Sequence, residues 1–120
     1  MPFQYILTNL LVDVPGAQGA IFLDPEGEAV ELVSHRATAY ELKLEGAYHG
    51  IFLRRASQLA GLVGAGELER LAITGRQIQV ISRVLKDGYY LVLVLEPGTP
   101  IVLASEAMRR TSEALNREIY

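Results

Sequence analysis

Residues 38–60 read TAYELKLEGAYHGIFLRRASQLA and predict one long helix. Thr38 followed three residues later by Glu41 forms a capping box, in which each side chain bonds the backbone N–H of the other residue. Apolar residues then recur at the spacing of one helical face. We expect this face to pack against the core of the domain, and it consists of Tyr40, Leu44, Ala47, Tyr48 and Ile51.

The opposite side of this helix carries a second apolar face, made of Leu42, Gly46, Gly50 and Leu53, with His49 beside it. Each glycine inside a helix costs about 1 kcal/mol relative to alanine, so a neighbour should pack closely here. Glycines four residues apart let two helix backbones approach, which favours self-association through this face. The alternative is a bulky neighbour within the same domain, such as Tyr90 beneath the helix.

The composition is that of an ordinary globular chain. Half of the 120 residues are hydrophobic, so we expect one domain over residues 1–120 with a core of its own. The net charge of −3, with both signs interspersed, argues against nucleic-acid and anionic-membrane partners. The sequence has no cysteine, no recognisable secretory signal and no apolar run of about 20 residues. These features favour a soluble, cytoplasmic protein.

The segments before the long helix predict a short helix and a β-hairpin. Apolar residues at helical spacing open the chain, and Pro15 and Gly16 stop that helix. Residues 17–23 and 28–33 are expected to be strands, since the turn residues Asp24-Pro25-Glu26-Gly27 lie between them.

Three strands and a helix are expected after the long helix. Residues 68–74 alternate like an edge strand, and a tight turn at Gly75-Arg76 would place Ile73 opposite Ile78 and Leu71 opposite Val80. Asp87-Gly88 predicts a turn between strands 77–85 and 89–95, of which the second is apolar on both faces and therefore central.

The last helix should begin at Thr99 as N-cap, with Pro100 in its first position, and run to about residue 119. We expect ion pairs on its solvated side, Glu106 with Arg110 and Glu113 with Arg117. Its expected buried face is Ala104, Met108, Thr111, Leu115 and Ile119. The order helix, two strands, helix, three strands, helix predicts an α+β fold with a five-stranded antiparallel sheet between helices.

No motif in the sequence predicts a catalytic, cofactor or metal site. The glycine-rich GLVGAGE at residues 61–67 follows a helix and opens a strand, which is the reverse of a phosphate-binding loop. His35 and His49 lack ligand spacing, and Ser34 beside His35 has no orienting acid. We therefore expect no enzyme activity, no cofactor and no metal.

Three features in this order resemble the Roadblock/dynein light chain domain family across almost the whole chain. They are the GAxGAxxxDxxG-like hairpin at residues 16–27, the Lys86-Asp87-Gly88 turn before an apolar strand, and the last amphipathic helix. The resemblance implies a profilin-like sandwich, with the middle helix on one face of the sheet and the terminal helices on the other. It also implies a homodimer in which third strands pair and middle helices pack together.

The function implied by the resemblance is that of a non-catalytic bacterial or archaeal adaptor, related to gliding-motility polarity regulators, that binds a Ras-like small GTPase. The implied dimer interface combines the glycine face of the helix with the edge strand: Leu42, Gly46, Gly50, Leu53, Leu68, Arg70, Ala72 and Thr74. The implied partner-binding residues are Lys43, His49, Leu53 and Arg54.

A small-molecule sensor or a purely structural dimer is the competing interpretation, because profilin-like sandwiches also hold ligands between sheet and helix. A polar pocket lined by Tyr40, Tyr48 or Tyr90 would favour sensing. A dry core at that place would favour the adaptor.

Overall fold

The computed structural model describes residues 2–35 and 38–119. These described residues form three α-helices, five strands and one short 3-10 helix. In chain order these are α1 (Pro2–Asp13), β1 (Ala17–Leu23), β2 (Ala29–Ser34), α2 (Ala39–Leu62), β3 (Arg70–Thr74), β4 (Gln79–Val84), η1 (Lys86–Gly88), β5 (Tyr90–Leu95) and α3 (Ile101–Glu118). The predicted α+β order is confirmed.

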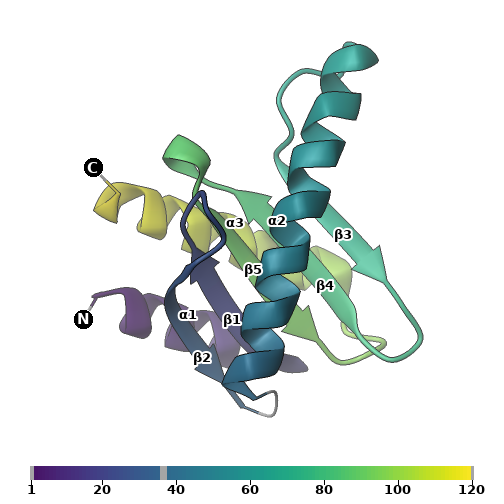
Figure 1. The fold of residues 1–120 in the computed structure, drawn as a ribbon. Helices are drawn as coiled ribbons and strands as arrows, with labels where there is room; N and C mark the ends of the chain where they lie inside the picture. The colour runs from purple at the N-terminus through teal and green to yellow at the C-terminus, as the bar shows by residue number, and fades with distance from the viewer. Residues whose placement is uncertain (1, 36–37, 120) are drawn as a thin grey trace.

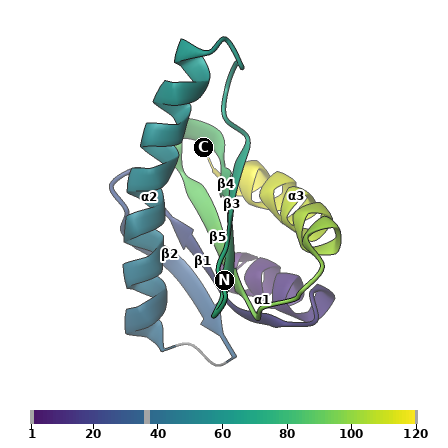
Figure 2. The same ribbon diagram turned by 90° about the vertical axis from the view of Figure 1, so that its right-hand side faces the viewer.

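The five strands form one antiparallel sheet in the order β2-β1-β5-β4-β3. The apolar β5 lies at its centre, and all six of its residues are buried. α2 covers one face of this sheet, whereas α1 and α3 cover the other (Figure 1, Figure 2). This sandwich agrees with the expected arrangement, and it leaves β2 and β3 as the two edges.

Two hydrophobic cores lie on opposite faces of the sheet because successive strand residues point to opposite sides. In β1, Ala20 and Phe22 belong to the core beneath α1 and α3, while Ile21 and Leu23 belong to the core beneath α2. The predicted inner face of α3 is buried in the first core and comprises Ala104, Met108, Thr111, Leu115 and Ile119.

The chemistry of the predicted turns is visible in two hairpins. The Asp24 carboxylate accepts hydrogen bonds from the backbone N–H groups of Glu26 and Glu28, at 2.9 and 3.0 Å. Asp87 and Gly88 both adopt left-handed backbone conformations, with φ of 57° and 84°, which aspartate and glycine tolerate better than most residues.

The predicted β3–β4 register is wrong by two residues. Ile73 pairs with Val80 and Leu71 with Ser82, because the connection is a four-residue loop closed by a 2.9 Å hydrogen bond from the Gly75 N–H to the Ile78 carbonyl. A shift of two residues leaves every side chain on its original face of the sheet. The apolar pattern is therefore the same in both registers.

The start of α3 also differs from the prediction. The Thr99 hydroxyl donates to the Glu96 carbonyl at 2.7 Å instead of capping the helix, so Pro100 is the N-cap and makes no side-chain cap. On the solvated side of α3, Glu106 pairs with Arg110 at 3.7 Å as expected, but Glu113 pairs with Arg109 instead of Arg117.

Candidate functional site

α2 packs on the sheet through the face that carries Gly46 and Gly50. Thr38 forms the predicted capping box with Glu41 and starts the helix. A Cβ at Gly46 would lie 2.7 Å from a Leu23 methyl group, and one at Gly50 would overlap the Tyr90 hydroxyl. That hydroxyl donates to the Gly46 carbonyl at 3.0 Å. The bulky neighbour beneath the helix, the alternative left open by the sequence, is therefore what the structure shows.

The burial of the two faces of α2 is the reverse of the prediction. The predicted dimer residues Leu42, Gly46, Gly50 and Leu53 are buried in the chain's own core, and the predicted core residues Tyr40, Leu44, Tyr48 and Ile51 are exposed. The prediction failed because small residues permit close approach of any neighbour, a sheet as well as a second helix.

His49 is buried as well, which removes it and Leu53 from the predicted partner-binding set. The side chain of His49 is 2% exposed, and its Nδ1 lies 2.5 Å from the Ser82 hydroxyl of β4. Burial lowers the pKa of His49 because the imidazolium would lose its hydration. The Glu45 carboxylate, 3.8 Å from Nε2, acts in the opposite direction, but its own side chain is 38% exposed and screened by water. His49 is thus a buried polar bridge between helix and sheet.

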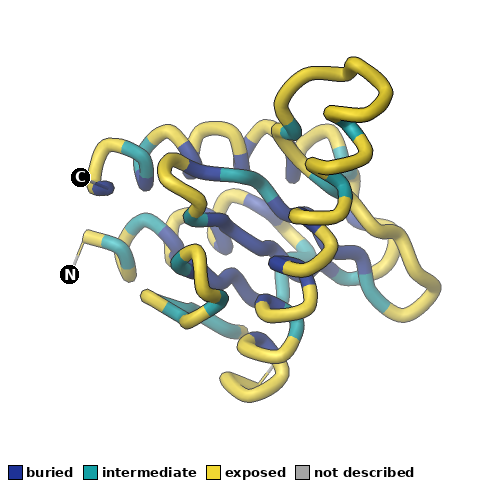
Figure 3. Tube along the Cα trace, turned by 45° about the horizontal axis from the view of Figure 1, so that its top comes forward, coloured by how far each residue is buried: buried dark blue, intermediate teal, exposed yellow. Residues whose placement is uncertain are grey.

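An exposed apolar stripe runs along the outer face of α2. Seven large hydrophobic side chains at least 39% exposed follow one another at helical spacing, and Tyr48 stacks on Phe52 with ring centroids 6.4 Å apart. The C-terminal part of α2 projects beyond the sheet and is mostly exposed (Figure 1, Figure 3). We call these residues the outer stripe: Tyr40, Leu44, Tyr48, Ile51, Phe52, Leu59 and Leu62. An apolar surface of this length is typical of an interaction site.

Three members of the outer stripe, Phe52, Leu59 and Leu62, were missed by the sequence analysis. The length of the helix could have indicated that these residues are exposed. A helix of 24 residues is about 36 Å long, whereas a six-residue strand spans roughly 20 Å, so one end of α2 had to extend past the sheet.

The edge strand β3 offers a second open surface. Hydrogen bonds from Val84 N to Glu69 O and from Gly75 N to Ile78 O fix the ladder with β4. Since bonding alternates along an antiparallel pair, Arg70, Ala72 and Thr74 direct their backbone N–H and C=O groups outward. These three predicted interface residues are exposed on the predicted edge, whereas Leu68 precedes the strand and packs against the core beneath α2.

The other edge of the sheet is better protected. In β2, the Glu31 carboxylate accepts a 3.1 Å hydrogen bond from the N–H of Leu32, a residue whose backbone groups point away from β1. A charged side chain that occupies edge backbone groups discourages pairing with another strand. Among the two edges, β3 is therefore the one suited to strand addition.

No metal-binding cluster of three histidine, cysteine or acidic residues occurs in residues 2–35 and 38–119. Within the same ranges, no helix is both long and apolar enough to cross a membrane. Of the predicted partner-binding residues, only Lys43 and Arg54 are exposed.

No family model and no curated protein matches the sequence. Solved structures match it in three dimensions. The gliding protein MglB from Thermus thermophilus superposes with a TM-score of 0.86 at 20% identity, over 97% of this chain and 87% of that chain. A Roadblock/LC7 domain from Streptomyces avermitilis gives 0.85 at 11% identity, over 95% and 94% of the two chains.

The chain has the Roadblock/LC7 fold. An MglB solved in a tetrameric arrangement is similar to the same degree, with a TM-score of 0.86, 20% identity, and 97% of this chain and 88% of that chain covered. The predicted resemblance is thus confirmed in fold, with the middle helix of this Roadblock/LC7 fold presenting its outer stripe to solvent.

Proposed function

We propose that this protein is a homodimeric, non-catalytic adaptor that binds and regulates a Ras-like small GTPase in the cytoplasm. The observation that carries the proposal is the outer stripe of α2 together with the open edge of β3. The Roadblock/LC7 fold supports it, since the family resemblance supplies the GTPase as the class of partner. The tetrameric arrangement of one MglB supports self-association of such domains.

A two-fold axis beside β3 would bury both the outer stripe of α2 and the open edge of β3 in one dimer interface. Antiparallel pairing of two copies of β3 uses the outward backbone groups of Arg70, Ala72 and Thr74 and joins the two sheets. The outer stripes of two α2 helices then meet on one side of the continuous sheet. Covering a half-exposed side chain such as Leu44, Tyr48 or Phe52 contributes roughly 1 kcal/mol each.

The GTPase is assigned to the surface that the paired α2 helices create. Lys43 lies near the start of α2 and Arg54 in its second half, and both are exposed. We retain these two residues as partner contacts. His49 and Leu53 act only indirectly, by seating the helix on the sheet.

The test is capture of a Ras-like GTPase encoded beside this gene, in its GDP-bound and GTP-bound states. We expect one nucleotide state to be retained preferentially, Lys43→Glu to weaken capture, and Arg76→Glu in the exposed β3–β4 loop to leave capture unchanged. If Lys43→Glu and Arg76→Glu weakened capture equally, capture would depend on net charge and Lys43 would not be a specific contact. No capture in either state would contradict the GTPase assignment.

Small-molecule sensing is a second candidate function, favoured by a groove of about 400 Å³ under the second half of α2. Tyr90 of β5 lines the groove, and its helix side is lined by Leu53, Arg54, Ser57 and Gln58 of α2. A volume in the range of about 300–1,000 Å³ with a few polar groups is typical of ligand sites. Native mass spectrometry of protein from its own host would show a bound molecule that Ser57→Trp excludes. An unliganded mass for the native protein would contradict sensing.

A further inference from the structure

A second hollow, of about 370 Å³, lies on the opposite face of the sheet from α2. Arg70 of β3, Arg83 of β4 and Arg109 of α3 line it, together with Glu106 and the apolar Ile101 and Val102. We call this hollow the arginine pocket. Three arginines around one glutamate give it a positive charge on a chain whose net charge is −3.

Two of these arginines are direct cross-strand neighbours. Arg70 and Arg83 are paired in the β3–β4 ladder, so their side chains stand on the same face of the sheet. Like charges directly opposite each other destabilise a sheet. Among the described residues, the side chain of neither arginine makes a hydrogen bond or an ion pair within 4.0 Å, although Arg83 is near enough to Glu106 to act on it electrostatically.

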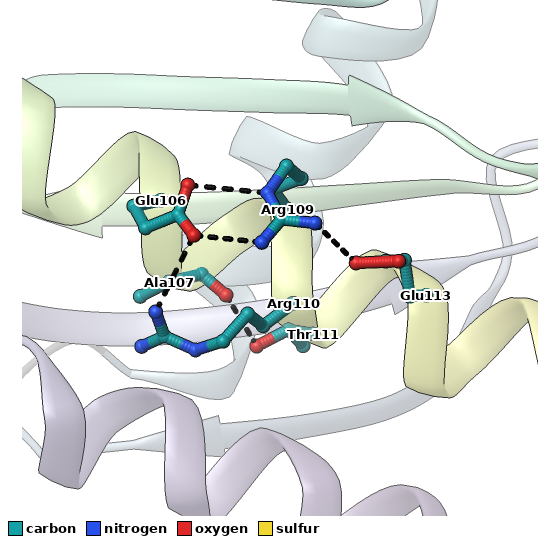
Figure 4. Close-up of polar contacts among 6 residues, drawn as sticks. All are labelled: Glu106, Ala107, Arg109, Arg110, Thr111 and Glu113. Carbon is teal, nitrogen blue, oxygen red and sulfur yellow. Dashed lines mark hydrogen bonds and ion pairs between the residues drawn. The ribbon is translucent and has the colours of Figure 1, made fainter.

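The acidic group of the pocket, Glu106, is already bonded to arginines of α3. Arg109 donates to both carboxylate oxygens of Glu106, at 3.1 and 2.7 Å, and also pairs with Glu113, while Arg110 approaches Glu106 to 3.7 Å (Figure 4). These hydrogen bonds from Arg109, and secondarily the nearby Arg110 and Arg83, lower the pKa of Glu106. Glu106 is therefore shared among several cations and leaves Arg70 and Arg83 without a full counter-charge.

The first turns of α3 add to the positive potential. The pocket is lined by Ile101 and Val102 at the very start of this 18-residue helix. Its N-cap Pro100 provides no side-chain hydrogen bond to the first turn. The partial positive charge of a helix N-terminus favours an anion at this place.

We propose that the arginine pocket binds the phosphate group of a phosphate monoester whose remaining body is apolar. A phosphate carries a charge of about −1.5 to −2 near pH 7 and offers three acceptor oxygens, enough to bridge the guanidinium forks of Arg70 and Arg83. Such a bridge removes the repulsion between the two arginines. The body of the ligand lies against Ile101 and Val102, of which Val102 is 84% exposed without a ligand.

Titration with naphthyl phosphate, followed by amide chemical shifts in the nuclear magnetic resonance spectrum of the full chain, tests this proposal. We expect saturation at one ligand per chain, with the largest shifts at Val102, Ser105 and Arg83. Arg83→Gln should weaken binding about tenfold or more, because it removes hydrogen bonds to a charged group. Arg117→Gln makes the same charge change on α3 outside the pocket and should leave binding unchanged.

Arg70→Gln is the second variant and should also weaken binding, which keeps the test available if Arg83→Gln does not fold. Three outcomes would overturn the proposal: shifts that do not saturate, equal weakening by Arg83→Gln and Arg117→Gln, or naphthol binding as tightly as its phosphate ester. All the lining residues belong to one chain and none of them is among the residues assigned to the GTPase, so failure of this test and failure of the GTPase assignment are distinguishable.

Discussion

Replacing Gly50 with alanine would bring a methyl group into steric overlap with the Tyr90 hydroxyl. On helix propensity alone this change should stabilise α2 by about 1 kcal/mol. Overpacking a filled site costs about 1–3 kcal/mol, however, and losing the hydrogen bond from Tyr90 to the buried Gly46 carbonyl costs a further 1–3 kcal/mol. We therefore expect Gly50→Ala to lower the free energy of unfolding by roughly 1–5 kcal/mol, with about 3 kcal/mol as the central value.

Urea denaturation at one fixed protein concentration measures this effect, and the midpoint should fall by about 1 M or more. Gly61→Ala is the matched control, because it lies in the same helix with open space around it, and it should be neutral or slightly stabilising. The double variant Gly50→Ala/Tyr90→Phe should recover part of the loss, since it removes the overlapping hydroxyl. If Gly50→Ala were as stable as Gly61→Ala, the packing of α2 on Tyr90 would be refuted.

Further predictions concern three polar side chains, of which His49 and Ser112 are buried and Asn116 is partly exposed. Because burial lowers the pKa of His49, the unfolded chain binds more protons than the folded one below about pH 6.5, so stability should decrease as pH falls through and below that value. His49→Asn should show a shallower decrease in pH-dependent unfolding, and equal slopes would contradict this. Ser112→Ala should be neutral or stabilising by up to about 1 kcal/mol in urea denaturation, because the hydroxyl is buried without a partner among the described residues. Asn116→Ala should lose about 1 kcal/mol in the same assay, because the Asn116 amide oxygen accepts the Lys86 N–H at 2.9 Å, and an unchanged midpoint would count against that contact.

The elements of the fold could be predicted because each carries local chemistry. The capping box at Thr38 and Glu41, the turns at Asp24 and Asp87, and the apolar strand β5 each specify their own conformation. Features that depend on distant neighbours were predicted less well. The β3–β4 register is one example, since pairing Ile73 with Ile78 or with Val80 gives the same apolar face.

The orientation of α2 shows most clearly what could not be predicted from the sequence. Its exposed outer stripe contains larger apolar residues than its buried face, where Gly46 and Gly50 leave room for side chains of the sheet. Leu23 and Tyr90 occupy that room. Tyr90 was one of the neighbours considered from the sequence, but nothing within residues 38–60 decides between it and a second helix. Large substitutions at Gly46 or Gly50 therefore test folding. From the sequence, the same substitutions would have been expected to test dimerisation. The arginine pocket was missed for a similar reason, because Arg70, Arg83 and Arg109 lie on three separate elements.

Self-association through the outer stripe is the central claim, and sedimentation equilibrium tests it directly. We predict a dimer for the native chain and a monomer for the double variant Tyr48→Lys/Ile51→Lys, with unfolding free energy measured in parallel to show that the variant is folded. Val12→Lys, at an exposed apolar position of α1, should remain dimeric. A native chain that sediments as a monomer, or a folded double variant that still sediments as a dimer, would contradict the account.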